Sequence, residues 1–197
     1  MTEPDTGSAA LSLKTTARRD GDHYVLSGSK AWITNGPRAD AVIAIARTAE
    51  GPAMQSLSCF YIPGDAPGLH RGDDQPRTGL KTCAIGPVTF EGCRVPAADR
   101  IGPEGAGAQI FLSAMTWERI GIMAMALGTM ESQLEVARRH ARTRRPDGTP
   151  ISRHQAVSHR IAGMKVRLES SRLLVYQAAW MKSCLLYTSP SPRDGTK

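Results

Sequence analysis

The sequence predicts an α+β protein, in which a small antiparallel β-barrel or sandwich domain is followed by the long antiparallel α-helices of a truncated helical bundle. Three observations support this class. Through the first half, short apolar or alternating runs are separated by Pro and Gly, as in a small all-β domain. Between Ala106 and Arg142 there is no proline, and apolar residues recur every three or four positions. A second such segment follows a loop at residues 146–150, so the two helices should pack antiparallel.

The strands of the first half are bounded by turn residues. Residues 11–17 and 23–28 alternate between apolar and polar side chains around a turn at residues 19–22, which is the pattern of a β-hairpin. Two continuous apolar runs, residues 39–47 and 57–62, are short enough to be buried strands. Further strands are expected at residues 69–71 and 87–90, and the β-domain should end near Pro96.

Each predicted helix carries an apolar stripe that we expect to be its packing face. In the first helix the stripe consists of Ile110, Ala114, Trp117, Gly121, Ala124 and Gly128. In the second helix it consists of Val157, Ile161, Met164, Leu168 and Val175. The opposite side of the second helix is basic and includes Arg160, Lys165, Arg167 and Arg172.

These boundaries divide the chain into three parts. Residues 1–100 form the β-domain, and residues 101–183 form part of a helical domain. The last fourteen residues, 184–197, do not continue the helical pattern and are similar to a translated adapter or vector read-through. We interpret them as a non-native tail outside the fold.

Charge and composition narrow the functional classes. The net charge of +7 favours polyanions, nucleotides or phosphorylated carriers as partners. The basic excess is concentrated between Arg138 and Arg172 and lacks interleaved aromatic residues, so a nucleic-acid-binding function is not expected. There is no uninterrupted apolar run of membrane-spanning length and no signal sequence, which predicts a cytoplasmic protein without a membrane span. The four cysteines form no C-x-x-C pair; we expect free thiols and no metal site.

The stretch from Gly28 to Gly36 is the strongest candidate for a binding element. It places the indole of Trp32 beside the hydroxyl of Thr34 at the end of a predicted strand, where Asn35-Gly36 forms a turn. Taken alone, such an indole is typical of a core residue whose N–H has found a partner. A flat indole beside a donor hydroxyl also suits a flat heterocycle, so both interpretations stay open at this point.

Five motifs, in order, resemble the acyl-CoA dehydrogenase family over residues 1–182. They are Thr2-Glu3-Pro4-x-x-Gly7-Ser8; Gly28-x-Lys30-x-Trp32-Ile33-Thr34-Asn35-Gly36; Val88-x-Phe90-x-x-Cys93-Arg94-Val95-Pro96; Gly102-Pro103-Glu104-Gly105-x-Gly107 with Trp117-Glu118-Arg119; and Arg144 with Gly148 and His154-Gln155-Ala156. The first three are similar to the family's middle β-domain and the others to its C-terminal helical domain. The β-then-α order predicted above agrees with this resemblance.

The resemblance implies an FAD cofactor. Thr2, Trp32, Ile33 and Thr34 would hold the isoalloxazine ring, with the indole packed on the ring system. Arg144 and Gln155 would reach the FAD of a neighbouring subunit, which implies a homodimer or homotetramer. The alternative for Arg144 is a solvated arginine at a helix end. Where the family commonly has an aromatic residue this chain has Asp147, whose charge would repel a pyrophosphate.

The resemblance also implies a reaction: α,β-dehydrogenation of an acyl thioester, by abstraction of an α-proton and transfer of a β-hydride to flavin N5. Ser8 would contact the thioester carrier, although the family's usual Asp after this serine is Ala9 here. The substrate-facing turn would consist of Thr116, Trp117, Glu118 and Arg119. Glu118 is either the catalytic base or a structural carboxylate paired with a nearby arginine, in which case the base lies in a later segment.

The implied partners are acyl-CoA or an acyl-carrier thioester, and an electron-transfer flavoprotein or similar acceptor, in fatty acid metabolism. The chain lacks the family's N-terminal helical domain, so we interpret it as an internal fragment with little or no activity of its own. Two alternatives stay open. One is a flavin-dependent oxidase or monooxygenase on the same fold. The other is a non-catalytic module that binds anions through its basic helices.

Overall fold

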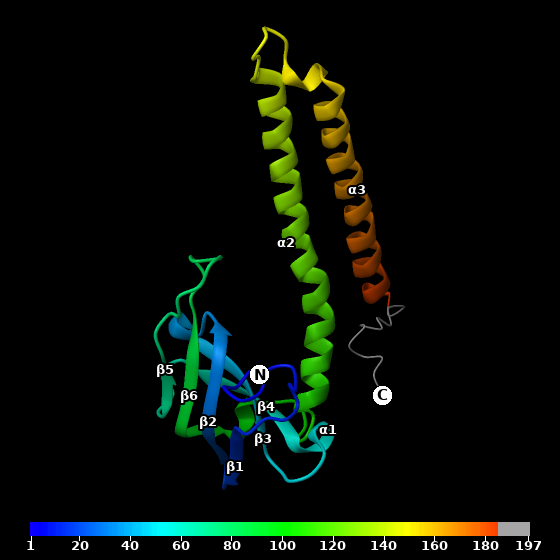
Figure 1. Ribbon diagram of the computed structural model, residues 1–197. Helices are drawn as coiled ribbons and strands as arrows, with labels where there is room; N and C mark the ends of the chain where they lie inside the picture. Colours follow the sequence, from blue (N-terminus) through cyan, green and yellow to red (C-terminus); the bar gives the residue numbers. More distant parts are fainter. Residues whose placement is uncertain (185–197) are drawn as a thin grey trace. The chain divides into compact units, whose positions relative to one another are not determined.

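The computed structural model describes residues 1–184 and contains two compact units, residues 1–113 and residues from 114 onward. The non-native tail predicted for residues 184–197 lies, apart from Cys184, outside the described residues. The first unit holds the strands, which are β1 (Thr16–Asp20), β2 (His23–Thr34), β3 (Ala41–Arg47), β4 (Leu57–Pro63), β5 (Leu69–Arg71), β6 (Ile85–Pro96) and β7 (Arg100–Ile101), and the short helix α1 (Ala53–Ser56) (Figure 1). The long helices are α2 (Gly107–Thr143) and α3 (Gln155–Ser183).

The strands form one sheet in the order β5-β6-β2-β1-β3-β4-β7. All neighbouring pairs are antiparallel except β1 and β3, which meet in parallel at Thr16 and Arg47. The predicted α+β class with a small β-domain is confirmed, and the single parallel pairing makes the sheet mixed. Strand β6 is longer than the predicted residues 87–90 because it pairs along nearly the whole of β2.

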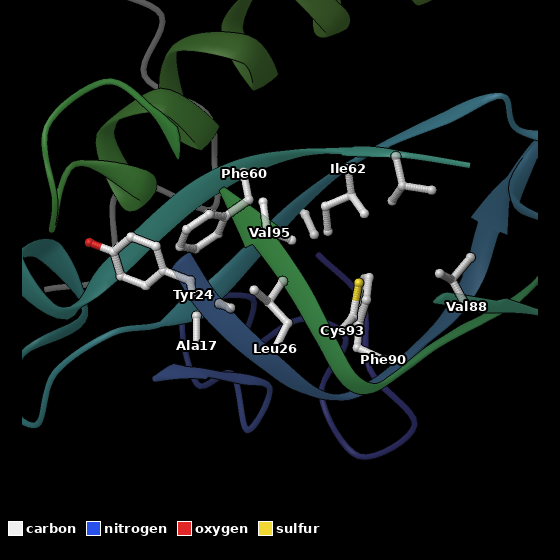
Figure 2. Close-up of a cluster of buried hydrophobic side chains, with 12 residues drawn as sticks. Ala17, Tyr24, Leu26, Phe60, Ile62, Val88, Phe90, Cys93 and Val95 are labelled. Carbon is white, nitrogen blue, oxygen red and sulfur yellow. The ribbon is translucent and has the colours of Figure 1, made fainter. Parts of the chain in front are cut away.

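The sheet curls around one apolar core. Side chains from β2, β4 and β6 point into the same interior (Figure 2), where the rings of Tyr24 and Phe60 lie 5.0 Å apart. The fully buried members include Leu26, Ile62, Val88, Phe90, Cys93 and Val95. Strands that are distant in the sheet order, such as β4 and β6, contribute side chains to this core. Burial of their apolar surface therefore stabilises the curved sheet and holds β2 in place.

The predicted strand at residues 11–17 is wrong over most of its length, because β1 begins only at Thr16. Leu13 is buried in a second cluster with Ile45 and Leu57. Its segment therefore packs against this cluster instead of pairing with a neighbouring strand. The backbone N–H groups of Lys14 and Thr15 donate to the carboxylate of Glu3, which replaces the ladder hydrogen bonds that a strand would make.

The two helices pack through a stripe of α2 that differs from the predicted one. Leu127, Met130 and Leu134 of α2 contact Leu168 of α3 and its neighbours, a three-and-four spacing that forms a continuous seam. The α3 stripe is confirmed in part, since Ile161, Met164, Leu168 and Val175 all lie in this cluster. The predicted α2 stripe is wrong in most of its members, because Trp117 and the glycines and alanines of the stripe are exposed, whereas Ile110 is partly buried against the second cluster.

Helix α2 is long and apolar enough to cross a membrane by length and composition alone. Its most apolar 18-residue window has a mean hydropathy of 1.3 and is only 6% buried. One such helix is weak evidence for a span, since the core helix of a soluble protein meets the same criteria. The expectation of no membrane span therefore stays a prediction.

Candidate functional site

A β-bulge near the end of β2 presents Trp32 to solvent. The pairing of β2 with β6 shifts register between Lys30 and Ile33, which leaves Ala31 and Trp32 outside the ladder. Trp32 has a φ of 58° and a side chain that is 61% exposed. A left-handed backbone is unfavourable for a bulky residue, and bulges are used to redirect side chains. The core interpretation of this indole is therefore wrong, and the bulge is the first candidate for a binding surface.

Thr2 lies against the bulge. The backbone N–H of Ala31 donates to the carbonyl oxygen of Thr2 over 2.9 Å, which satisfies the amide that the bulge removes from the ladder. Beyond the bulge, Ile33 is partly buried against the apolar core. Thr34 is exposed and pairs with Ile85 of β6. The structure thus brings the backbone of Thr2 to the bulge and places Thr34 two residues after the exposed indole of Trp32.

A buried ion pair joins Lys30, which directly precedes the bulge, to Glu3. The Nζ of Lys30 is 2.8 Å from Oε1 of Glu3, and both side chains are 3% exposed. Glu3 also accepts from the Thr15 hydroxyl at 2.6 Å, and Lys30 also donates to the carbonyl of Ile45 at 2.8 Å. Every one of these buried polar atoms has a partner, as a water-excluded charge requires.

The pair is asymmetric in its hydrogen bonding. Burial alone would raise the pKa of Glu3, but hydrogen bonds from Lys30, from Thr15 and from the backbone N–H groups of Lys14 and Thr15 outweigh it and lower that pKa to about 2. Burial lowers the pKa of Lys30 by more than its contact with Glu3 raises it. The difference follows from the contacts, because the carboxylate accepts four hydrogen bonds while the ammonium has two acceptors.

Sequence reasoning did not assign this pair a role. Glu3 and Lys30 both lie inside motifs that resemble the family. Their opposite charges, next to Thr2 and close to Trp32 in the sequence, are a signal from which a supporting ion pair could have been predicted. The sequence does not indicate that the loop before β1 folds back onto β2. No local pattern in residues 1–15 specifies the contacts of Thr2 and Glu3 with Ala31 and Lys30.

Ser8 lies in the loop before β1 and is exposed. The loop is closed by reciprocal backbone hydrogen bonds between Glu3 and Thr6, of 3.0 and 3.1 Å. Ser8 is therefore on the same loop as Thr2, with its hydroxyl available to a ligand.

In the second unit, the predicted substrate-facing turn lies on α2. The indole of Trp117 is half-exposed, and Nζ of Lys182 from α3 lies 5.6 Å from its ring centroid, a cation–π distance. A groove of about 320 Å³ runs between the helices beside this turn. It is lined by Arg119, Ile120, Met123, Ser171, Leu174, Val175 and Ala178. The lining is mostly apolar, which suits an aliphatic chain.

Glu118 lies next to this groove and is exposed. It lines a smaller depression of about 250 Å³ with Met115, Arg119, Ile122 and Met123. Among residues 1–184, the ion pairs found do not include Glu118. A carboxylate beside apolar side chains is chemically suited to take a proton from a bound substrate.

Arg144 and Gln155 flank the connection between α2 and α3. The backbone of Arg144 is held by hydrogen bonds with His140 and Ile151, of 2.9 and 3.0 Å, while its guanidinium is exposed. Gln155 is the first residue of α3 and is also exposed. The two side chains are thus available to a ligand outside the chain.

The charge of Asp147 is used within this connection. Its Oδ1 accepts the N–H of Thr149 at 3.1 Å, and its Oδ2 lies 3.9 Å from Nε2 of His154. The carboxylate of Asp147 thus caps its own turn, and its negative charge stays within this connection.

Metal ligation finds no support in this part of the chain. Within residues 1–184 there is no group of three or more His, Cys, Asp or Glu residues that could hold a metal ion. The four cysteines are free thiols, and burial raises the pKa of both Cys59 and Cys93.

Two family models match the chain. The model of the acyl-CoA dehydrogenase middle domain matches residues 1–93, and the model of the acyl-CoA dehydrogenase C-terminal domain matches residues 105–184. The chain is 44% identical to an L-prolyl-[peptidyl-carrier protein] dehydrogenase of Pseudomonas fluorescens, over 91% of this chain and 48% of that protein. It is 36% identical to the mitochondrial short-chain specific acyl-CoA dehydrogenase of Rattus norvegicus, over 92% of this chain and 44% of that protein.

The chain is also similar to solved structures of FAD-dependent and acyl-carrier enzymes. The prolyl acyl carrier protein oxidase AnaB matches with a TM-score of 0.85 and 42% identity, over 92% of this chain and 48% of that one. An FAD-dependent dehydrogenase matches with a TM-score of 0.87 and 41% identity, over 92% and 49%. The chain therefore spans about half the length of the proteins that it matches.

Proposed function

Because this chain belongs to the acyl-CoA dehydrogenase family, we propose that it forms part of an FAD-dependent oxidoreductase that introduces an α,β double bond into an acyl thioester. The observation that carries the proposal is the β2 bulge, which exposes the indole of Trp32 beside Thr2 and Thr34. Packing among residues 1–184 does not account for a strained, exposed tryptophan, whereas a flat aromatic ligand would cover it.

The side chains at the bulge fit a flavin. The hydroxyls of Thr2 and Thr34 could donate to or accept from the polar edge of the isoalloxazine ring, and Trp32 and Ile33 would help to hold the ring. When bound, FAD supplies the two-electron acceptor and takes the β-hydrogen of the substrate as a hydride at N5. The protein's part is to orient the ring and to tune its surroundings.

Arg144 and Gln155 would hold the FAD of a neighbouring subunit. A guanidinium offers a fork of donors that matches a pyrophosphate, and the exposure of both side chains is consistent with a ligand that comes from another copy of the chain. The assembly proposed is a homodimer or homotetramer.

The substrate proposed is an acyl thioester carried by CoA or by a carrier protein. Relatives of both kinds support this class, since one is named for a prolyl carrier-protein thioester and another for a short-chain acyl-CoA. Ser8 would contact the carrier, and Thr116, Trp117 and Arg119 would face the substrate. Glu118 would accept the α-proton at its carboxylate. An electron-transfer flavoprotein or a similar acceptor would then remove the electrons.

A second candidate is an oxidase on the same scaffold, in which oxygen is the electron acceptor. The observation that favours it is the 42% identity to a solved prolyl acyl carrier protein oxidase. The two candidates share the dehydrogenation step and differ only in how reduced flavin is reoxidised.

The test is a titration of the chain with FAD, followed by flavin absorbance after addition of short-chain acyl-CoA or of prolyl thioester on a carrier protein. The proposal expects FAD binding to the chain that Trp32→Ala weakens. Because the chain spans about half the length of its relatives, bleaching by at least one thioester class is expected of the whole enzyme of which the chain is proposed to form part. Fast reoxidation in air would favour the oxidase. Binding of pyrophosphate without FAD would favour the anion-binding module and contradict the proposal.

A further inference from the structure

Two buried charged residues lie next to the hydrogen bond between Ala31 and Thr2 at the bulge. Glu3 directly follows Thr2, and Lys30 directly precedes Ala31, whose N–H donates to the Thr2 carbonyl. The ion pair between Glu3 and Lys30, 2.8 Å long, therefore joins the same two chain segments. It lies one residue after Thr2 in the first segment and one residue before Ala31 in β2. No strand ladder joins these segments, because residues 1–15 lie outside the sheet.

The bulge needs such a tie. Trp32 is held at a φ of 58°, a conformation that persists in a bulky residue only when the surroundings impose it. The indole itself is exposed and supplies little of that restraint. The buried ion pair supplies this restraint. Lys30 is hydrogen-bonded to Glu3 and to the carbonyl of Ile45 in β3, and Glu3 is hydrogen-bonded to Thr15.

We propose that Glu3 and Lys30 are positioning residues that hold the Trp32 bulge and Thr2 in the arrangement needed to orient a flavin ring. The inference rests on the proposed function and adds to it a role for two residues that do not touch the ligand. A buried ion pair is well suited to this task, because its directional hydrogen bonds fix one geometry while burial excludes water that would compete for them.

Glu3→Gln tests the inference, because it keeps the shape of the side chain and leaves the ammonium of Lys30 without its counter-charge. We expect the Kd for FAD to rise by about tenfold or more, since a buried group has lost its partner. At saturating FAD we expect the visible circular dichroism of the bound flavin to change. In the FAD-free chain, the Ala31 amide should exchange its hydrogen about tenfold faster or more, as the tie to Thr2 loosens.

Tyr24→Phe is the matched control. Tyr24 lies on the same strand, eight positions before Trp32, and its buried hydroxyl is hydrogen-bonded to Glu104 at 2.7 Å and to Arg100 at 2.9 Å. Its removal should lower stability without changing the flavin dichroism or the exchange at Ala31. If Tyr24→Phe produces the same two changes as Glu3→Gln, the pair acts through general stability and the inference is wrong.

The double variant Glu3→Gln/Lys30→Met separates positioning from the presence of an unpaired charge. It should recover stability relative to Glu3→Gln, while the flavin dichroism and the Ala31 exchange stay altered. Full recovery of both readouts would overturn the inference. If the parent chain fails to bind FAD, the proposed function fails, and exchange at Ala31 alone then decides whether the pair holds the bulge.

Discussion

Gly28 of β2 lies directly against Thr15, so closely that a Cβ at position 28 would be 2.6 Å from the Thr15 hydroxyl oxygen and 2.7 Å from its Cα. Gly28 also has a φ of 146°, which side chains rarely adopt. Because Thr15 donates its hydroxyl and its N–H to Glu3, this close approach connects the motif on β2 with the loop that carries Thr2.

Gly28→Ala should therefore disturb both the fold and the candidate site. The clash includes Cα of Thr15, a backbone atom that cannot rotate away, so we expect a loss of about 2 kcal/mol or more in the free energy of unfolding. Displacement of Thr15 should also weaken FAD binding. Urea unfolding and FAD titration measure the two effects. Gly79→Ala is the control, because a Cβ there would meet no atom within 4 Å; equal effects at both positions would contradict the packing argument.

Trp32 should contribute to binding far more than to stability. Trp32→Gly removes a strained side chain that is 61% exposed, and the relief of strain offsets the added flexibility of glycine, so the free energy of unfolding should change by less than about 1 kcal/mol. The Kd for FAD should rise by about tenfold or more, as expected for loss of an aromatic contact. Trp180→Ala, at an equally exposed indole of α3, should leave the Kd unchanged. A large loss of stability in Trp32→Gly would indicate a structural role.

The Glu3 carboxylate should make stability depend on pH in the acid range. Its pKa in the folded chain is about 2, against 4.5 as its ordinary value. The depressed pKa means that the contribution is complete above about pH 4.5 and is lost as pH falls towards 2, and the shift corresponds to roughly 3 kcal/mol. Urea unfolding between pH 2 and 6 measures it, and Glu3→Gln should flatten the curve.

Asp74→Asn is the control for this pH dependence. The pKa of Asp74 is also lowered, mainly by hydrogen bonds from Arg77 and from the backbone of Ile85, but the group is exposed. Solvent screens such a pair, so the variant should keep most of the acid-range slope. A flat curve for Asp74→Asn, or an unchanged one for Glu3→Gln, would contradict the assignment of the slope to Glu3.

Arg144 should contribute to FAD binding through its charge. Arg144→Met removes an exposed guanidinium without disturbing the backbone hydrogen bonds that end α2. Loss of a charge-assisted contact to pyrophosphate should raise the Kd by about tenfold, and the dependence of that Kd on salt should weaken. Arg145→Met is the adjacent, equally exposed control. The solvated-arginine alternative predicts instead that both variants bind FAD like the parent chain.

Elements defined by local pattern could be predicted from the sequence. The turn at Gly21-Asp22, the apolar runs of β3 and β4, and the α3 stripe at Ile161, Met164 and Leu168 each follow from periodicity and turn residues. The resemblance located Trp32 and Thr2 as partners before any contact was known, because motif order carries long-range information that periodicity lacks.

Features that depend on long-range contacts could not be predicted. The segment before β1 alternates like a strand, yet its backbone donors go to Glu3, twelve positions before Thr15. On α2, two stripes of small and apolar residues satisfy the helical period, and only contact with α3 selects the one with Leu127 and Leu134. The φ of Trp32 is likewise imposed by the bulge, which no local preference of tryptophan would indicate.

Glu118 should be the decisive residue for the chemistry, because it is the carboxylate that lines the depression on α2. If it takes the α-proton, Glu118→Gln should lower the rate of flavin reduction by a thioester by about 10²- to 10⁴-fold, the usual contribution of a positioned base. FAD binding should not change. The rate is measured in the whole enzyme of which the chain is proposed to form part, as loss of flavin absorbance in a single anaerobic turnover.

Glu135→Gln is the matched control for Glu118→Gln. It removes a carboxylate from the same helix, where the pair with Arg138 is exposed and contributes little, so it should reduce flavin at the parent rate. Exchange of the α-proton of a thioester with deuterium in solvent gives a second readout, since it needs the base but not the hydride acceptor. If Glu118→Gln keeps both flavin reduction and α-proton exchange, the base lies elsewhere and Glu118 only lines the substrate groove.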